Sequence, residues 1–459
     1  MNVHSARLAI MGAAVLFALT DAAQGPPRSL SVPDGFTFAA VGDLLQERPL
    51  MPLEEAQFRE VDSIIRGADV AFGNGEMPII DISSSRVYPE AENGGGDLYG
   101  LPSVAADLKA QGFAIVSRAN NHSTDWGISG MEMTDRFLDD AGIVHAGTGR
   151  NEAAARAAHF IETKWGRVGL ASTTSTFEGN EPAGAAFGDV AGRPGASTLS
   201  TTQAIVVSQS TINGLRQYYG GAEYSQDASL IPHGILLYTQ PYVAGNAPGI
   251  QYTMDPHDLG AILRGIRQGS TVSNFMVFSV HCHESASGAS NVVPQGAFLR
   301  DLAHKAIDAG ADVFVGHGPH QVGGIEIYKG KPIFYSLGNY IFQLDLLENP
   351  NAESWRGSGL DSSRSIDADY EKTFIKHWFT PPEYWQSVIA VTTYRNNAAA
   401  EISLYPLDLR QTAELNMRGI PRLADDAEAA TILKRIARLS EPYHTHIQIE
   451  GRVGKIVLQ

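Results

Sequence analysis

Two histidines directly follow a short apolar segment, where their imidazoles can bind a cation or a phosphate. The segment Ala311–Val315 is rich in β-forming residues, and Gly316 then frees the backbone to turn before His317 and His320. In open α/β sheets, ligands bind at the carboxyl ends of the strands. We therefore expect both side chains to converge at a strand end, although a histidine pair this close can also be purely structural.

Matching side chains follow four other apolar segments. They are two carboxylates, one amide and two imidazoles, namely Asp43, Glu76, Asn121, His122 and His281. With the first histidine pair they form a set of oxygen and nitrogen ligands that suits Mn, Zn or Fe. One or two such ions would activate a water molecule and hold the oxygens of a phosphate or carbonyl group. Each motif alone is equally typical of a turn, so the predicted metal site depends on their joint occurrence in this order.

The elements that must position these residues alternate between helix and strand. Gly35–Leu45 is predicted as a buried strand, and Asn274–Val280 as another one that leads into His281. Helix-then-strand patterns occupy Val61–Gly73, Val104–Ser117 and Phe298–Val315. This alternation predicts an α/β fold with a largely parallel sheet, in which the carboxyl ends of the strands meet at one edge.

We expect one domain over residues 35–345, with an insertion at about 172–269 that either shapes a substrate cleft or is peripheral scaffold. Residues 346–385 are expected to be a loop-rich, acidic segment and a candidate lid. Residues 386–459 would complete the same domain with a hairpin, whose turn is Asn396–Asn397, followed by a helix and terminal strands.

The first 24 residues have the pattern of a signal peptide. Arg7 precedes the apolar stretch Leu8–Leu19, and small residues follow at Ala22 and Ala23. The alternative is a disordered or buried N-terminal helix. No other segment approaches the ~20 apolar residues of a membrane span. We therefore expect a periplasmic or extracellular protein with no transmembrane span after cleavage of the signal.

Composition narrows the function classes. The chain has 459 residues, of which 43% are hydrophobic, enough for a large core. The formal net charge of −16 argues against nucleic acid as a partner, since that requires basic patches. An acidic substrate would need a metal or a local cationic cluster. The single cysteine, Cys282, excludes an intrachain disulfide and a cysteine-based zinc site.

Several segments resemble the CapA/PgsA family of capsule-synthesis proteins, within the calcineurin-like metallophosphoesterase superfamily. They are Val41–Leu45, Asn74–Pro78, Ala119–Gly127, Val280–Glu284 and Val315–Phe342. The resemblance implies a metallophosphoesterase-like four-layer αββα sandwich of two mixed β-sheets, with metals at the strand ends.

The resemblance also implies roles for individual residues. Glu76 would bridge two metals, and the other metal ligands would be Asp43, Asn121, His281, His317 and His320. His122 would be a catalytic histidine that binds no metal and handles a proton. Asp125 would orient His122, unless it instead caps a helix.

The chain departs from this pattern in three places. Phosphoesterases carry a metal-binding histidine where Leu45 stands, so one metal would lose a ligand. The family also leads us to expect a histidine at Gly318 and an aromatic residue near Cys282. His283 and Glu284 could compensate as ligands, or could simply cap the strand end.

Three functions fit these residues and the resemblance. The first is a metal-dependent hydrolase of phosphoesters or amides that acts in capsule or poly-γ-glutamate synthesis. The second is a non-hydrolytic component that binds or exports the anionic polymer together with capsule-assembly proteins. The third is a metal-assisted peptide epimerase, in which the metal polarises a carbonyl beside a histidine base.

Overall fold

The structure is a computed structural model that describes residues 30–53, 55–84, 86–89, 98–218, 234–237, 239–344, 352–361 and 363–458. The predicted signal peptide, residues 1–24, lies outside these ranges. Among the described residues, no helix has the length and apolarity needed to cross a membrane.

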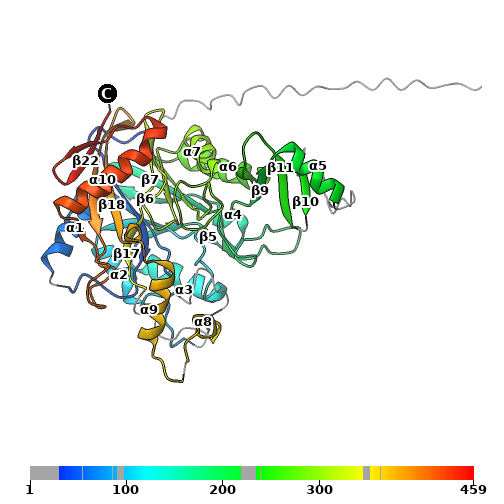
Figure 1. Cartoon of the computed structure of the whole chain (residues 1–459). Coiled ribbons are helices and arrows are strands. Elements are labelled where there is room, and N and C mark those ends of the chain that lie inside the picture. Colours follow the sequence, from blue (N-terminus) through cyan, green and yellow to red (C-terminus); the bar gives the residue numbers. More distant parts are fainter. Residues whose placement is uncertain are drawn as a thin grey trace, which may run out of the picture.

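The largest element of the body is a mixed ten-stranded sheet (Figure 1). Its strands are β1 (Thr37–Leu45), β2 (Val70–Asn74), β3 (Phe113–Ser117), β4 (Val144–Ala146), β17 (Asn339–Phe342), β18 (Gln386–Arg395), β19 (Ala398–Asp408), β20 (Arg422–Leu423), β21 (Gln448–Glu450) and β22 (Val453–Val457). They follow the order β21-β22-β19-β18-β1-β2-β3-β4, with β17 paired to β1 and β20 to β19. The central strand β1 runs parallel to β2 and β17 and antiparallel to β18.

A second mixed sheet has six strands. They are β6 (His159–Thr163), β7 (Gly166–Thr174), β13 (Phe275–His281), β14 (Val313–His317), β15 (Ile325–Tyr328) and β16 (Lys331–Phe334). The order is β15-β16-β14-β13-β7-β6; the four inner strands are parallel to one another, and the two edge strands pair antiparallel. The fold is therefore mixed α/β, as the sequence predicts.

The two sheets share one apolar core, to which Phe38 and Phe72 contribute from one side and Val277 and Val315 from the other. Helices α1 (Ala56–Gly67), α2 (Ser103–Ala110) and α3 (Gly127–Asp140) pack against the other face of the ten-stranded sheet. Helices α6 (Pro256–Thr271) and α7 (Ala297–Asp308) pack against the six-stranded sheet. Because both faces of the central strands are buried, their sequences are continuous apolar runs.

The C-terminal hairpin and helix form as predicted. Asn396 and Asn397 connect β18 to β19 with φ of 50° and 58°, the backbone that a two-residue hairpin turn requires. Asp425 caps helix α10 (Asp426–Ser440) by accepting hydrogen bonds from two backbone N–H groups. Helix α10 then packs into the core shared by the two sheets.

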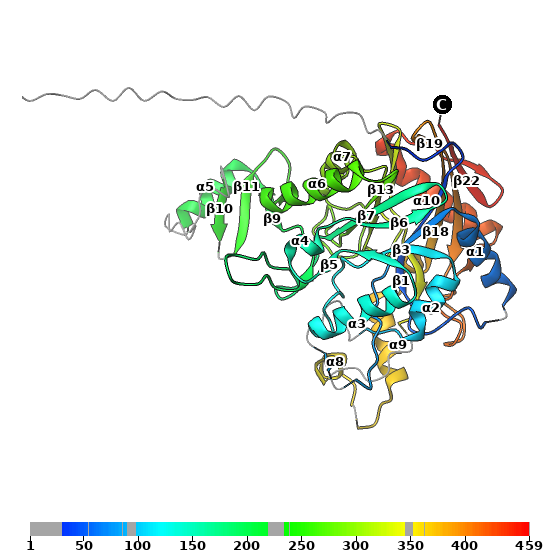
Figure 2. The same cartoon turned by 180° about the vertical axis from the view of Figure 1, so that it is seen from behind.

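Part of the predicted insertion forms a separate small sheet that projects from the body in both views (Figures 1 and 2). Its strands are β9 (Thr201–Val207), β10 (Gly234–Leu237), β11 (Gln240–Ala244) and β12 (Gly249–Met254), accompanied by helix α5 (Gln209–Tyr218). Most of helix α6 also falls within residues 172–269, but its Ile262 and Ile266 belong to the core of the six-stranded sheet. The body of the fold therefore resumes at Pro256.

The segment 346–385, expected to be rich in loops, contains helices α8 (Ala352–Ser358) and α9 (Asp367–Trp378) and the 3-10 helix η2 (Pro382–Trp385). Its buried aromatic and aliphatic side chains share one cluster with Leu45 and Phe342, namely Tyr370, Phe374, Ile375, Phe379, Tyr384 and Trp385. This cluster holds the segment at the ends of β1 and β17.

Candidate metal centre

The parallel strands bring the predicted ligands together at their carboxyl ends. Asp43 is the last residue of β1 that pairs with β2, and it lies opposite Asn74, the last residue of β2. In the other sheet, His281 at the end of β13 lies opposite His317 at the end of β14. All four side chains are fully buried. The register of the two sheets therefore places acidic and imidazole groups in one interior space.

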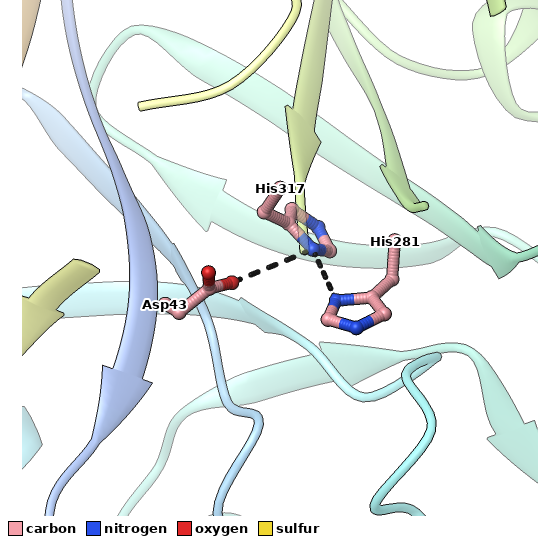
Figure 3. Close-up of side chains that lie close together, drawn as sticks. All are labelled: Asp43, His281 and His317. Carbon is pink, nitrogen blue, oxygen red and sulfur yellow. Dashed lines mark hydrogen bonds and ion pairs between the residues drawn. The ribbon is translucent and has the colours of Figure 1, made fainter. Parts of the chain in front are cut away.

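Figure 3 shows the first group of these side chains, Asp43, His281 and His317. The Nδ1 atom of His317 lies 3.8 Å from Oδ1 of Asp43 and 3.0 Å from Nδ1 of His281. On its other side, Nε2 of His317 lies 2.6 Å from Oγ of Ser279, which fixes the ring. Nδ1 of His317 therefore faces the space between the two sheets.

Glu76 is the centre of the second group. Its Oε1 atom has no hydrogen-bond partner and lies 3.7 Å from Nε2 of His281, 3.8 Å from Nε2 of His320 and 3.9 Å from Nε2 of His122. Two donor atoms that each lie about 2.1 Å from one ion are separated by roughly 3–4 Å. The spacing around Glu76 therefore fits ligands around a shared cation, and it is too long for direct hydrogen bonds.

His320 has an unusual backbone. Its φ of 57° lies in the left-handed region, which non-glycine residues seldom adopt and which the surrounding structure must hold in place. Nδ1 of its ring lies 2.8 Å from Oδ1 of Asn339, whose amide donates to the Tyr384 carbonyl. Because Asn339 can only accept at Oδ1, His320 donates from Nδ1 and presents the lone pair of Nε2 to Glu76.

Gly318 explains one departure from the family pattern. Its φ is +116°, and a Cβ atom there would lie 2.8 Å from the backbone oxygen of Cys282. A histidine at this position is thus excluded by the backbone of this chain. Cys282 itself is buried in the apolar core of the six-stranded sheet.

The charges of the group also fit a bound cation. Burial lowers the pKa of His122 and of His283 to about 3 and that of His317 to about 4, so these imidazoles are neutral. Although burial opposes it, His320 and His317 hold the pKa of Asp43 down to about 2. Burial and the nearby Asp43 raise the pKa of Glu76 well above its ordinary value. Neutral imidazoles and buried carboxylates are the donors that a divalent transition metal takes.

His122 and Asp125 form a buried hydrogen-bonded pair. Nδ1 of His122 lies 2.7 Å from Oδ2 of Asp125 and donates to it, which leaves Nε2 without its hydrogen. Helix α3 begins two residues later with Trp126 at its N-cap, without a side-chain cap. The hydrogen bond thus favours the orienting role of Asp125 over a helix cap. The amide of Asn121 lies 3.2 Å from Nε2 of His122.

Sequence reasoning did not single out two asparagines as members of the site. Nδ2 of Asn74 donates to Oδ1 of Asp43 at 2.8 Å and lies 3.4 Å from Oε2 of Glu76, so it orients both carboxylates. Asn339 orients His320 in the same way. Asn74 ends a strand and Asn339 begins one, each beside a glycine, and this position was the one available signal.

Leu45 lies outside the group of ligands. It is buried in the apolar cluster with Phe342, Phe379 and Trp385, which covers the strand ends next to the site. Phe379 also packs edge-on against His320, with ring centroids 5.7 Å apart. Leu45 is thus part of the packing that holds residues 352–385 beside the site.

Glu181 is a buried carboxyl group close to the His122–Asp125 pair. Its side chain is fully buried, and Oε1 has no hydrogen-bond partner. Burial raises the pKa of Glu181 to about 9, despite a hydrogen bond from the Glu178 backbone, and Asp125 raises it further. Glu181 is therefore protonated in the folded protein at neutral pH.

We predict that Glu181→Gln makes the protein more stable at pH 8 but not at pH 5. The folded pKa lies above the unfolded one, so the wild type loses stability as pH rises from about 4.5 to about 9. Between pH 5 and 8 this loss is about 4 kcal/mol, and the glutamine variant lacks it. Urea unfolding of both proteins at the two pH values measures the difference. An equal pH dependence in wild type and variant would contradict a neutral Glu181.

Comparisons with known proteins identify the family of this chain. A family model described as bacterial capsule synthesis protein PGA_cap matches residues 37–344. The uncharacterized protein y4sH of Sinorhizobium fredii is 40% identical over 440 residues, which cover 93% of this chain and 94% of that protein. The capsule biosynthesis protein CapA of Bacillus anthracis is 22% identical over 311 residues, 67% of this chain and 59% of that protein. The PGA biosynthesis protein CapA of Bacillus subtilis is 25% identical over 316 residues, 67% of this chain and 64% of that protein.

The fold and the site define a mixed α/β protein with buried acidic and imidazole side chains gathered at its strand ends. The chain belongs to the bacterial capsule synthesis family, as the sequence resemblance implied.

Proposed function

We propose that this chain is a metal-dependent hydrolase with a metallophosphoesterase-like four-layer sandwich, which acts in the synthesis of capsule or poly-γ-glutamate polymer. The observation that carries the proposal is the convergence of two buried carboxylates and three imidazoles, those of Asp43, Glu76, His281, His317 and His320. The names of the two Bacillus relatives, which refer to capsule and PGA biosynthesis, support the polymer role. Residues 1–24 would direct the chain to the periplasm or cell exterior.

The ligands would be the acidic, amide and imidazole groups at the strand ends, namely Asp43, Glu76, Asn121, His281, His317 and His320. They would hold one or two ions of Mn, Zn or Fe. Such ions would supply Lewis acidity and lower the pKa of a water molecule in the site. Asn74 and Asn339 would keep Asp43, Glu76 and His320 in orientation.

His122 and Asp125 would handle the proton. Asp125 accepts the hydrogen of Nδ1, so Nε2 of His122 faces the reaction space 3.9 Å from Oε1 of Glu76. In this tautomer Nε2 can take a proton and return it to the leaving group of a phosphoester or amide. The acidic chain repels an anionic polymer, so the positive field for the substrate would come from the metal centre.

A specific observation also favours a second candidate, a polymer-binding component without hydrolytic activity. Because Leu45 is part of an apolar cluster, the ion held by Asp43 lacks one ligand of ordinary phosphoesterases. A centre weakened in this way could bind the anionic chain, or polarise a carbonyl for epimerisation, without cleaving it.

Metal content per chain tests the proposal. We expect elemental analysis of the wild-type protein to find about two tightly held transition-metal ions, and the metal-loaded protein to hydrolyse an aryl phosphoester. Metal without turnover on ester or amide substrates, together with salt-sensitive binding of poly-γ-glutamate, would support the second candidate instead. Absence of metal after loading would overturn the metal-dependent function.

A further inference from the structure

We propose that His283 is a metal ligand of this chain, which completes a site with Glu76 and His281. This inference rests on the metal centre proposed above and adds a residue that the family pattern does not supply. His283 is buried, and its ligand atom lies within 4.8 Å of those of Glu76 and His281. The three side chains together offer two imidazole nitrogens and one carboxylate oxygen.

The distances within this group fit coordination to one ion. Nε2 of His283 lies 2.8 Å from Nε2 of His281, which in turn lies 3.7 Å from Oε1 of Glu76. Two nitrogens on adjacent positions of one ion, each about 2.1 Å from it, are about 3 Å apart. Without a cation, the two nitrogens can approach this closely only if one of them keeps its hydrogen. The pair is therefore already spaced as two neighbouring ligands.

Asn291 fixes the ring of His283 in the form that binds metal. Nδ1 of His283 faces Oδ1 of Asn291, an oxygen that can only accept. His283 must therefore carry its hydrogen on Nδ1 and its lone pair on Nε2, toward Glu76 and His281. Metal-binding histidines commonly donate their other N–H to such an oxygen.

Asn291 is itself held by the protein. Its backbone oxygen accepts hydrogen bonds from Nε2 of Gln321 and from the hydroxyl of Tyr384, both at 3.0 Å. The backbone N–H of His283 donates to Oγ1 of Thr176 at 2.9 Å. The loop after β13 is thus fixed from both sides, and a residue that merely ends a strand would not need this support.

A metal ligand at His283 would offset the metal ligand that is missing at Leu45. His281 presents Nε2 to Glu76 and His283, while its Nδ1 faces His317. Because an imidazole binds one ion through one nitrogen, His281 and His283 can serve one ion together. His283 thus adds one imidazole to a centre that has no ligand at Leu45. Two histidines and one carboxylate are typical ligands of Zn and Fe(II).

Metal titration of single variants tests this assignment. Zn²⁺ and Co²⁺ are titrated calorimetrically into the metal-free wild type, His283→Ala and His283→Gln, and the absorption spectrum of bound Co²⁺ is recorded. We expect both variants to lose one ion, or to bind it at least about 10-fold more weakly, with a changed Co²⁺ spectrum. The glutamine variant keeps the side-chain volume, and circular dichroism checks that both variants fold. His145→Ala, at another buried histidine, is the matched control and should bind as the wild type does.

Variants of Asn291 separate ligation from packing. Asn291→Ala should weaken the same ion by about 10–100-fold, whereas Asn291→Asp, which keeps an acceptor oxygen, should retain it. Equal stoichiometry, affinity and Co²⁺ spectrum in wild type and folded His283 variants would overturn the assignment and leave the proposed function intact. A wild type that binds no metal would overturn both.

Discussion

The Glu76→Gln variant will lose the tightly bound metal, and its hydrolytic activity will fall by at least about 100-fold. Oε1 of Glu76 is the atom that three imidazole nitrogens approach to between 3.7 and 3.9 Å. Glutamine removes the negative charge and replaces one oxygen by a group that cannot coordinate. Loss of a residue that only orients a ligand already costs 10–100-fold, so loss of the bridging ligand should cost more.

Elemental analysis and ester hydrolysis, measured on the same preparations, check this expectation. Glu428→Gln makes the same change at a half-buried carboxyl group in helix α10 and serves as the control. A Glu76→Gln protein with the full metal content of the wild type would contradict the bridging role.

The pH dependence of metal binding gives a second readout of Glu76. Burial and Asp43 raise the pKa of Glu76 in the metal-free protein, so a proton competes with the metal at this carboxyl group. Metal affinity in the wild type should therefore rise with pH as this proton leaves. The slope should be smaller in Glu76→Gln, which has no such proton.

The positions of the candidate ligands at the strand ends could be predicted from sequence, because each depends on a local pattern. The buried strands β1, β2, β3, β13 and β14 are short apolar runs, and parallel pairing brings the residues after them to one edge. Asp43 lies opposite Asn74, and His281 opposite His317, as a result of that pairing alone.

The supporting contacts could not be predicted, because they join residues far apart in the chain. Asn339 reaches His320 only after β17 has paired with β1. Asn291 reaches His283 because the loop after β13 folds back, and no periodicity encodes that turn. The aromatic residues of α9 were expected in a loop, because their packing partners, such as Leu45 and Phe342, lie elsewhere in the sequence.

The packing role of Leu45 could not be predicted from sequence for the same reason. Read from sequence, Leu45 is a lost metal ligand. In the structure it belongs to the apolar cluster that holds residues 352–385 at the strand ends. Leu45 thus anchors the covering segment, and the resemblance to phosphoesterases implies that it would also leave one metal position short of a ligand.

The His122→Ala variant will keep the metal content of the wild type but will hydrolyse esters about 10²–10⁴-fold more slowly. The family resemblance makes His122 the histidine that binds no metal, and Asp125 holds its Nδ1 so that Nε2 carries no hydrogen. We therefore expect His122 to move protons and not to hold a metal ion. Asp125→Asn should lower the rate in the same direction, because an amide no longer fixes the tautomer.

Rate and metal content, measured together, distinguish the two candidate functions. His145→Ala is a matched control, since His145 is also buried, with Nε2 3.3 Å from Oδ1 of Asp139, and lies outside the candidate site. A slow His122→Ala enzyme with full metal content would mean that the centre catalyses proton transfer, which a polymer-binding protein does not need. Loss of metal in His122→Ala would make His122 a ligand. An unchanged rate would mean that the proton moves through another group, and the assignment of His122 would be wrong.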